Sequence, residues 1–544
     1  MGNLKNFSVL SCSELSFLTL FLYLKRKDLK KMWNNIIAKI TEINDAVNGF
    51  VWGWPMIIMI LGTGLLISLR LKFMQITKFG ESITSTIVPA IKGIGKKKSS
   101  TDKKENSISQ FEAFSAAISG TVGTGNIIGV TSAILTGGPG AVVWMWISAF
   151  FGMLTNYAEN VLGLYYRKKD ENGNFSGGAF YYIAYGLKQK WLGYIAAFFC
   201  LFAAIGMSGV QTNKISGTFT SVLSLDSTLS KIIIGIIVAV ITGIVVIGGI
   251  KRIGKVASML VPFMSLIFII MAVIIIAINI TAVPQTLKLI FTSVFSAKAV
   301  AGGVGGFAFG KIIQKGLARG VFSNEAGLGS SVIAHSASEV KEPVKQGLWG
   351  VFEVFFDTFI ICTLTALVIL TTNVANGAYQ AGTFFGTFNG ATFNVANDSA
   401  TALSAFSQNL GTVGSIIFCV FLPLFAFTTI LAWSYYGEKA TEFFFQWLPK
   451  KGQQTAVICF KVIYVLLIVF ASVIEGELIW AIDDTFNGLM ALPNLIAVVL
   501  LSGQIVKITK NYYERKNGKN VEPMLSAYPE LNAKFIKELE KTSK

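Results

Sequence analysis

The stretch S-G-T-V-G-T-G-N-I-I-G, from Ser119 to Gly129, lies in the middle of an apolar segment long enough to cross a membrane. It contains four glycines and three small hydroxyl residues. Glycine inside a helix costs about 1 kcal/mol relative to alanine, and an unpaired backbone amide in hydrocarbon costs several kcal/mol more. We therefore expect the helix to break here, with a polar solute filling the gap.

A second interruption of the same kind, F-S-N-E-A-G-L-G-S, runs from Phe322 to Ser330. Paired interruptions in corresponding halves of a chain indicate the binding site of a secondary transporter. Half-helix N-termini present free N–H groups that suit a carboxylate, whereas facing carbonyl oxygens suit an ammonium group or a sodium ion. A zwitterionic amino acid requires both kinds of group.

The composition places the chain in a bilayer, because 53% of its residues are hydrophobic and only 14% are charged. The net charge of +17 comes from Lys and Arg residues that cluster in short loops, so it indicates membrane orientation and not nucleic-acid binding. The cysteines are scattered and the lone His335 lacks a partner for zinc or for a serine protease. Neither an enzyme nor a metal site other than one for sodium is predicted.

A bilayer core requires about 20 apolar residues per helix, and about eleven segments meet this requirement. They cover residues 48–70, 110–133, 139–165, 192–213, 230–248, 255–280, 300–330, 346–372, 411–435, 455–473 and 478–505. The lysine-rich loop 70–104 is placed in the cytoplasm by the positive-inside rule. Alternation then makes the other basic loops cytoplasmic and leaves 373–410, which has no Lys or Arg, outside.

The fold class predicted from these spans is an all-α membrane protein with two inverted repeats of five helices. Repeats of five invert topology, so the two broken helices face each other near the midplane. The expected parts are an N-terminal extension at 1–47, an extra first span with its basic loop at 48–109, the repeats at 110–280 and 281–506, and a cytoplasmic tail at 507–544. We expect the true start at Met32; a cleaved signal-like segment or an extra span at Val9–Leu24 are the alternatives.

Several long motifs also resemble a known family. They are G-T-G-N-I-I-G (Gly123–Gly129), L-T-G-G-P-G-A-V-V-W-M-W (Leu135–Trp146), R-G-V-F-S-N-E-A-G-L-G-S (Arg319–Ser330), W-S-Y-Y-G-E-K (Trp433–Lys439) and L-P-N-L-I (Leu492–Ile496). In this order they resemble the alanine or glycine:cation symporter family, over residues 48 to 507. The resemblance implies the leucine-transporter-type fold of the amino acid-polyamine-organocation superfamily. It also implies sodium- or proton-coupled uptake of small neutral amino acids through a prokaryotic plasma membrane, without a cofactor.

A weaker resemblance, to the neurotransmitter:sodium symporters, is carried by Val122–Asn126 and by Phe322 and Ser323 with Gly327 and Gly329. It implies a sodium ion held by carbonyl oxygens in the first break and by a carbonyl and two hydroxyls on the eighth core helix. The implied ligands are Ser119, Val122, Phe425, Thr428 and Thr429. The last three have the i, i+3, i+4 spacing of one helical face, and their oxygens suit a small alkali cation. The alternative is that both threonines bond back to their own helix.

The same resemblance implies a substrate chamber lined by Trp433 and Gln211 and by residues of both breaks. The predicted substrate-binding residues are Thr124, Gly125, Asn126, Gln211, Phe322, Ser323, Asn324 and Trp433. Asn126 and Ser323 suit either the substrate carboxylate or a second ion. For Trp433 the alternative is an interfacial aromatic belt, and for Gln211 it is a helix end.

Four carboxylates, Glu159, Glu325, Glu353 and Asp357, lie in apolar segments, where their cost makes them functional candidates. Glu325 lies inside the second break, where it could pair with Arg319 and gate the inner side; a purely structural role is the alternative. Glu353 and Asp357 share a helical face at i, i+4 and could form a proton relay, although bonding to backbone ends is the alternative.

The function predicted from the sequence is sodium-coupled symport of alanine, glycine or a related small neutral amino acid across a lipid bilayer. Proton coupling through the buried carboxylates and a preference for glutamine are alternatives within transport. A channel or a non-transporting amino-acid sensor is the alternative outside it. A channel would require a continuous polar stripe along several helices, whereas breaks at one depth favour an occluded site.

Overall fold

The structure is a computed structural model that describes residues 32, 35–93, 108–169, 173–223, 225, 227–294, 305–376, 387–388, 391–392, 398–474 and 476–543. The predictions for residues 1–31 lie outside these ranges. The chain divides into two units, Met1–Phe50 and Val51–Lys544. Residues 35–50 of the first unit are helical.

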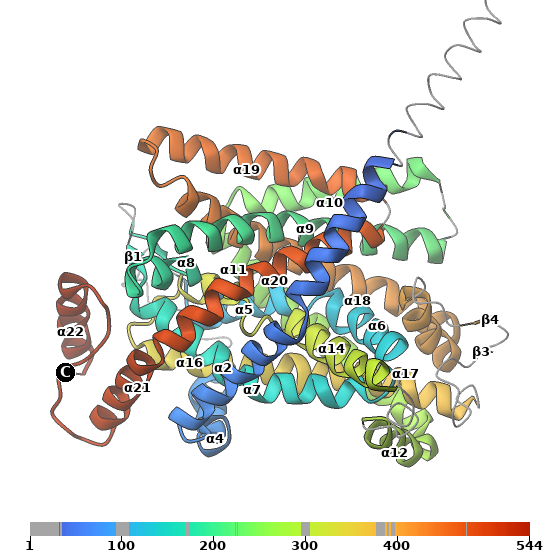
Figure 1. Ribbon diagram of the computed structural model, residues 1–544, viewed down its shortest axis with the longest axis horizontal. Helices are drawn as coiled ribbons and strands as arrows, with labels where there is room; N and C mark the ends of the chain where they lie inside the picture. The colour runs from blue at the N-terminus through green and yellow to red at the C-terminus, as the bar shows by residue number, and fades with distance from the viewer. Residues whose placement is uncertain are drawn as a thin grey trace, which may run out of the picture. The chain divides into compact units, whose positions relative to one another are not determined.

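The first half of the second unit consists of helices, because backbone polar groups in hydrocarbon must pair within their own segment. These elements are α2 (Trp54–Arg70), α3 (Met74–Thr77), α4 (Phe79–Gly93), α5 (Gln110–Thr121), η2 (Thr124–Asn126), α6 (Ile128–Gly137), α7 (Ala141–Tyr165), α8 (Ala179–Tyr181), η3 (Tyr182–Gly186), α9 (Lys190–Leu223), α10 (Thr228–Val246) and α11 (Gly249–Ile278). The helices α9, α10 and α19 (Lys450–Ala471) lie side by side in Figure 1.

The second half is built in the same way and contains one long π-helical segment, η5. Its elements are η4 (Ile280–Ala282), α12 (Val283–Ser293), α14 (Gly305–Asn324), α15 (Ser331–His335), α16 (Pro343–Val354), η5 (Phe355–Cys362), α17 (Thr363–Ala375), α18 (Asp398–Phe444), α19 (Lys450–Ala471), α20 (Gly476–Leu500), α21 (Ser502–Lys516) and α22 (Pro529–Ser543). The sequence predicted an ordinary α-helix where η5 lies.

Strands contribute only two small hairpins to the described part of the chain. β1 (Lys168–Lys169) pairs antiparallel with β2 (Phe175–Ser176), and β3 (Thr387–Phe388) pairs antiparallel with β4 (Ala391–Thr392). The predicted all-α class is therefore confirmed.

Eight helices among the described residues are long and apolar enough to cross a membrane, and ten spans result if each of two bent helix pairs counts as one. The first bent pair, α5 and α6, has an angle of 54° and confirms the predicted break at Ser119–Gly129. The second pair, α20 and α21, is bent by 60°. The predicted span at 300–330 is absent from this set; its helix α14 carries Lys315 and Arg319.

Helical structure extends across two of the predicted boundaries. α18 begins at Asp398, so the last part of the predicted outer loop 373–410 is helical, and a kink at Gly411 (φ 59°) separates it from the rest. The predicted tail from residue 507 begins inside α21, because the bend after Leu500 does not end helix formation.

A large apolar core surrounds the first break and draws on α5, α6, α7, α11, α17 and α18. Its aromatic centre contains Phe268, Phe406, Phe421 and Phe425, whose neighbouring ring centroids lie 5.3 to 6.4 Å apart. α10, α11 and α19 instead expose large apolar side chains on their outer faces. An outward apolar face of this kind suits contact with lipid.

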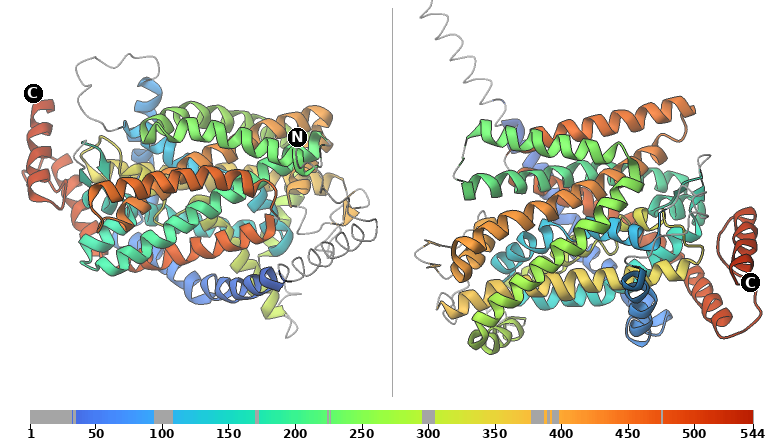
Figure 2. Two further views of the ribbon diagram at one scale, coloured as in Figure 1. Left: turned by 90° about the horizontal axis from the view of Figure 1, so that it is seen from above. Right: turned by 180° about the vertical axis from the view of Figure 1, so that it is seen from behind.

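The C-terminal segment packs onto the end of the bundle where the β1–β2 hairpin and α8 lie (Figures 1 and 2). Phe535 of α22 packs on Phe175 of β2, with 5.9 Å between ring centroids. The guanidinium of Arg515 binds both carboxylate oxygens of Glu342, at 2.5 and 2.9 Å. The first contact holds the tail against β2, and the second holds it against the loop that precedes α16.

Candidate functional site

The first break has a defined backbone path. α5 ends at Thr121, Gly123 is extended (φ −128°, ψ −156°), and the short 3₁₀ turn η2 leads into α6. The Gly123 N–H donates to Asn126 Oδ1 at 2.8 Å. A side chain of the break therefore satisfies one of the amides that the interruption frees.

The second break is longer, running from Glu325 to Ser330 between α14 and α15. Three of its residues have a left-handed backbone, with φ of 55° at Glu325, 95° at Gly327 and 74° at Gly329. A non-glycine residue in this region costs about 1–3 kcal/mol and is held by its surroundings. The predicted break is confirmed, and Glu325 is the residue that carries its strain.

Side chains from both breaks converge on one buried carboxylate. Asn126 Nδ2 donates to Asp357 Oδ1, and Ser323 Oγ donates to Asp357 Oδ2 at 2.9 Å. Thr358 Oγ1 adds a hydrogen bond at 2.8 Å, and Cys362 Sγ lies 3.2 Å from Ser323 Oγ. We call Asp357, Asn126, Ser323, Thr358 and Cys362 the Asp357 cluster; it joins elements from the two predicted repeats.

The other predicted substrate residues surround the first break on further sides. Thr124 Oγ1 donates to Gln211 Oε1 at 2.9 Å, and Gln211 is buried within α9 and is not at its end. An added Cβ at Gly125 would meet only the ring of Phe322, at 3.4 Å. Phe322 itself stacks on Trp480, with ring centroids 5.5 Å apart.

Asn324 is the predicted substrate residue that faces its own break. Its Oδ1 accepts the N–H of Ala326 at 3.0 Å, and its Nδ2 donates to Thr358 Oγ1 at 3.1 Å. Both ends of the amide are therefore engaged in holding the second break against η5.

The five predicted cation ligands are all buried. α5, which carries Ser119, contacts α18, which carries Phe425, Thr428 and Thr429. Thr429 Oγ1 of α18 lies 3.0 Å from the carbonyl oxygen of Ser119 and 3.0 Å from that of Phe425. Thr428 Oγ1 donates to the carbonyl oxygens of Leu424 and Phe425. Both hydroxyls thus bond back to their own helix, as the alternative states, and Thr429 also reaches across to the first break.

Glu325 does not pair with Arg319, so that prediction is wrong. Arg319 Nη1 lies 3.4 Å from Asp484 Oδ1 of α20, whereas Glu325 accepts from Ser330 Oγ at 2.5 Å and from Trp433 Nε1 at 3.0 Å. The two residues are six positions apart, which is not a spacing that brings side chains together on one face of a helix. Trp433 is fully buried, which rules out a place in an interfacial belt.

Trp433 therefore provides a rigid buried wall beside the second break, which leads to a prediction about selectivity. We expect Trp433→Ala to admit larger amino acids, such as leucine or glutamine, and to weaken binding of alanine and glycine through lost packing. A hydrophobic wall discriminates by only about 1–3 kcal/mol per methylene, so steric closure by a bulky ring is needed. Competition assays on purified wild type and variant measure this, with Trp433→Phe as the matched control. An unchanged ranking of competitors would remove Trp433 from the chamber.

Glu353, another of the four predicted carboxylates, contacts the histidine of α15. Glu353 Oε2 lies 2.8 Å from His335 Nε2, whose Nδ1 contacts Gln346 Nε2 at 2.6 Å. Glu353 and Asp357 have different hydrogen-bond partners, and their proton relay stays a prediction.

Asn494 is a site residue that the predictions missed. Its Nδ2 donates to Glu159 and to the carbonyl oxygen of Gly327, at 2.9 Å for the latter. It lies in the motif L-P-N-L-I, so a polar residue after a helical proline was the available signal.

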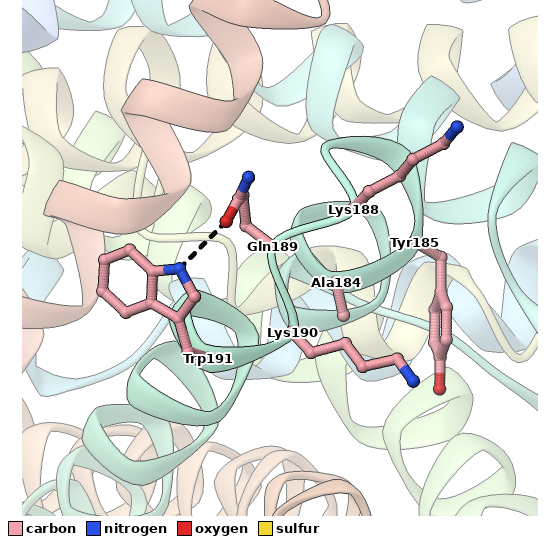
Figure 3. A pocket seen from close by; sticks show the side chains of 6 residues that line it. All are labelled: Ala184, Tyr185, Lys188, Gln189, Lys190 and Trp191. Carbon is pink, nitrogen blue, oxygen red and sulfur yellow. Dashed lines mark hydrogen bonds between the residues drawn. The ribbon is translucent and has the colours of Figure 1, made fainter.

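A surface pocket lies elsewhere, at the junction of η3 and α9 (Figure 3). It is lined by Ala184, Tyr185, Lys188, Gln189, Lys190 and Trp191. Trp191 is 62% exposed and donates to Gln189 Oε1 at 2.9 Å. The pocket contains none of the predicted site residues, and basic and aromatic side chains of this kind are typical of a membrane–water interface.

The amino-acid sequence of the chain is similar to those of known transporters. The chain is 40% identical to the sodium/alanine symporter AgcS of Methanococcus maripaludis, over 87% of this chain and 97% of that protein. It is 39% identical to an uncharacterized transporter of Haemophilus influenzae (88% and 97% covered) and 34% identical to the probable sodium/glutamine symporter GlnT of Bacillus subtilis (88% and 91% covered).

The fold is also similar to a solved structure, MhsT in complex with L-phenylalanine. The TM-score is 0.51 at 15% identity, and the match covers 75% of this chain and 99% of that one. This likeness confirms the leucine-transporter-type fold. The model of the sodium:alanine symporter family matches residues 37–526. With two broken helices meeting in a bundle of membrane-spanning helices, the chain belongs to the sodium:alanine symporter family and is a multi-pass plasma-membrane transporter of amino acids, not an enzyme.

Proposed function

We propose that the protein couples the entry of sodium to uptake of a small neutral amino acid such as alanine or glycine. The observation that carries the proposal is the convergence of both breaks on one buried cluster, where Asn126 and Ser323 meet Asp357. Neither break alone offers groups for both ends of a zwitterion, whereas the two together do.

The proposed sodium site uses oxygens of Ser119, Val122, Phe425, Thr428 and Thr429. The position of Thr429 Oγ1 supports this site, because the hydroxyl lies 3.0 Å from the carbonyl oxygen of Ser119 and 3.0 Å from that of Phe425. Three of the proposed ligand oxygens are therefore already close together. Hard oxygen ligands of this kind suit an alkali cation. Binding there would hold α18 against the first break.

The proposed substrate chamber is narrow. Phe322 lies next to Gly125, and Trp433 is held in place by Glu325. Two large aromatic rings beside the breaks would exclude a bulky substrate side chain. The names of the relatives AgcS and GlnT include alanine and glutamine, respectively, so both amino acids belong in the test.

The experiment that tests the proposal is uptake of labelled alanine, glycine and glutamine into proteoliposomes, with sodium, potassium and proton gradients imposed separately. We expect uptake of alanine or glycine to be driven by the sodium gradient and not by the potassium gradient. Uptake driven only by a proton gradient would instead favour the coupling alternative, for which the buried Glu325, Glu353 and Asp357 are the available carriers.

A variant of the sodium site provides a second prediction. We expect Thr429→Ala to raise the sodium concentration for half-maximal uptake by at least about tenfold, since a cation loses one oxygen ligand and a tenfold change corresponds to about 1.4 kcal/mol. Protein abundance should change little. Sodium titration of uptake measures the effect, with Thr441→Ala of the same helix as control, because Thr441 Oγ1 contacts only the Gly437 carbonyl in the described structure. An unchanged sodium dependence would remove Thr429 from the site.

A further inference from the structure

The pocket at the junction of η3 and α9 presents positive charge that no acidic side chain of its lining balances (Figure 3). Its volume is about 360 Å³. Lys188 and Lys190 line it and are exposed, and neither makes an ion pair within the described part of the chain. Lys168 of β1 adds a third ammonium group, whose Nζ lies 3.5 Å from the centroid of the Tyr185 ring. The pocket therefore suits the anionic group of a ligand.

A hydrogen-bonded turn presents these lysines. Lys188 has a left-handed backbone, with φ of 59°. On one side of it, the Leu187 N–H donates to the carbonyl oxygen of Tyr182 at 3.1 Å. On the other side, the Gln189 N–H donates to the carbonyl oxygen of Ile183 at 3.3 Å. Because both flanking residues are tied back to the same helical segment, the pocket is formed by the fold and does not need a ligand to order it.

An exposed apolar stripe on α9 begins at this pocket. Trp191, Ile195, Phe198 and Phe202 have the i, i+4, i+7, i+11 spacing of one helical face, and all four are exposed. The Phe202 ring stacks on Phe486 of α20, with ring centroids 5.3 Å apart, so the stripe continues onto a neighbouring helix. An exposed apolar face on a membrane-spanning helix contacts acyl chains. Since Trp191 belongs to both the pocket and the stripe, positive charge and lipid-facing surface meet there.

The combination of charge and apolar surface decides which ligand fits. An inorganic phosphate ion or a soluble phosphate ester would use the pocket and leave the stripe unused. A phospholipid has an anionic phosphate joined to acyl chains, so it matches both parts at once. The positive-inside rule favours the cytoplasmic side for the basic loop before α9, and the cytoplasmic leaflet is the one whose anionic lipids attract basic protein segments.

We propose that this pocket binds the headgroup phosphate of an anionic phospholipid, with an acyl chain along the stripe on α9. Lys188 and Lys190 form charge-assisted hydrogen bonds with the phosphate, and Trp191 places its ring at the level of the headgroup. Tyr185 forms a wall of the pocket and is held by its hydroxyl, which donates to Gln446 Oε1 at 3.1 Å. The inference does not depend on which amino acid or cation is transported.

The test uses Trp191 as a local reporter of the lipid at the pocket. The full-length protein is reconstituted into bilayers that mix phosphatidylglycerol with phosphatidylethanolamine, one of which carries bromine atoms on its acyl chains. Bromine quenches the fluorescence of a tryptophan that it contacts, and the signal of Trp191 is the difference between the wild type and Trp191→Phe. We expect brominated phosphatidylglycerol to quench this signal by half at a mole fraction about tenfold lower than brominated phosphatidylethanolamine.

Variants of the two lysines assign the preference to the pocket. In the double variant Lys188→Gln/Lys190→Gln, we expect the two lipids to quench Trp191 at equal mole fractions, whereas Lys188→Arg/Lys190→Arg should keep the preference. The matched control is Lys537→Gln/Lys541→Gln, which removes the same charge from exposed positions of α22 and should also keep it. If the glutamine variant fails size-exclusion chromatography, the wild type at high salt decides, because screening should remove an electrostatic preference.

Three results would overturn the inference. The first is equal quenching by the two lipids in the wild type, or a preference that survives in Lys188→Gln/Lys190→Gln. The second is an equal loss of preference in the α22 control, which would show a general attraction of the basic surface for anionic lipid. The third is relief of quenching by glycerol 3-phosphate added to the aqueous phase, which would identify a soluble phosphate ester as the ligand. No uptake is measured, so each result leaves the proposed function to its own test.

Discussion

Gly123→Ala should abolish sodium-dependent amino-acid uptake, although it adds only one methyl group. An added Cβ at this position would collide with Thr429 Oγ1, so the Thr429 hydroxyl would have to move away from the first break. The backbone at Gly123 is extended, so alanine is not strained there and the effect comes from the contact alone. We expect the proposed sodium site to lose its geometry and uptake to fall to background.

Uptake in proteoliposomes, together with a sodium titration of alanine binding, measures this effect. Gly129→Ala is the matched control, because it lies six residues further along and an added Cβ would meet nothing within 4 Å. Alanine is also a better helix former than glycine, so the control should insert and transport normally. Normal sodium dependence in Gly123→Ala would show that the contact between Thr429 and the first break is dispensable.

Gly125→Leu should eliminate amino-acid binding while the protein still inserts into the membrane. The new side chain would extend toward the Phe322 ring, which lies 3.4 Å from the position of an added Cβ. Phe322 cannot retreat freely, because it stacks on Trp480. The leucine would therefore fill the space next to the backbone N–H groups proposed for the substrate carboxylate, and close backbone approach is the reason for glycine there.

Equilibrium binding of alanine to the purified variant is the measurement, and its behaviour in size-exclusion chromatography reports folding. Gly217→Leu places the same side chain on an exposed face of α9, where an added Cβ meets nothing within 4 Å. That control should bind alanine as the wild type does. If Gly125→Leu binds alanine normally, the first break is not the substrate site.

The interruptions could be predicted because they are local. Four glycines within Ser119–Gly129 weaken a helix wherever it lies, and Gly327 and Gly329 allow the left-handed backbone that the second break adopts. Apolar length predicted the spans for the same reason, since the cost of a polar group in hydrocarbon depends on the segment alone. The helical segments 398–410 and 502–516 were not predicted, because they are more polar than the apolar spans of α18 and α20 that they adjoin.

The partners of individual side chains were less predictable. Arg319 and Glu325 are close in sequence, yet Glu325 accepts a hydrogen bond from Trp433 and Arg319 pairs with Asp484 of α20. Asp357 was identified as a costly carboxylate, but its contact with Asn126 joins residues 231 positions apart. No local pattern encodes such a distance.

The sequence by itself thus determined the membrane class, the two breaks, the family motifs and the residue types available for a zwitterion and a cation. The tertiary structure decided which of them meet: Thr429 with Ser119, Trp433 with Glu325, and both breaks with Asp357. The physical reason is that helix breaking and membrane insertion depend on the free energy of one segment. The site instead depends on the packing of segments from both halves, and that packing is set by the whole core.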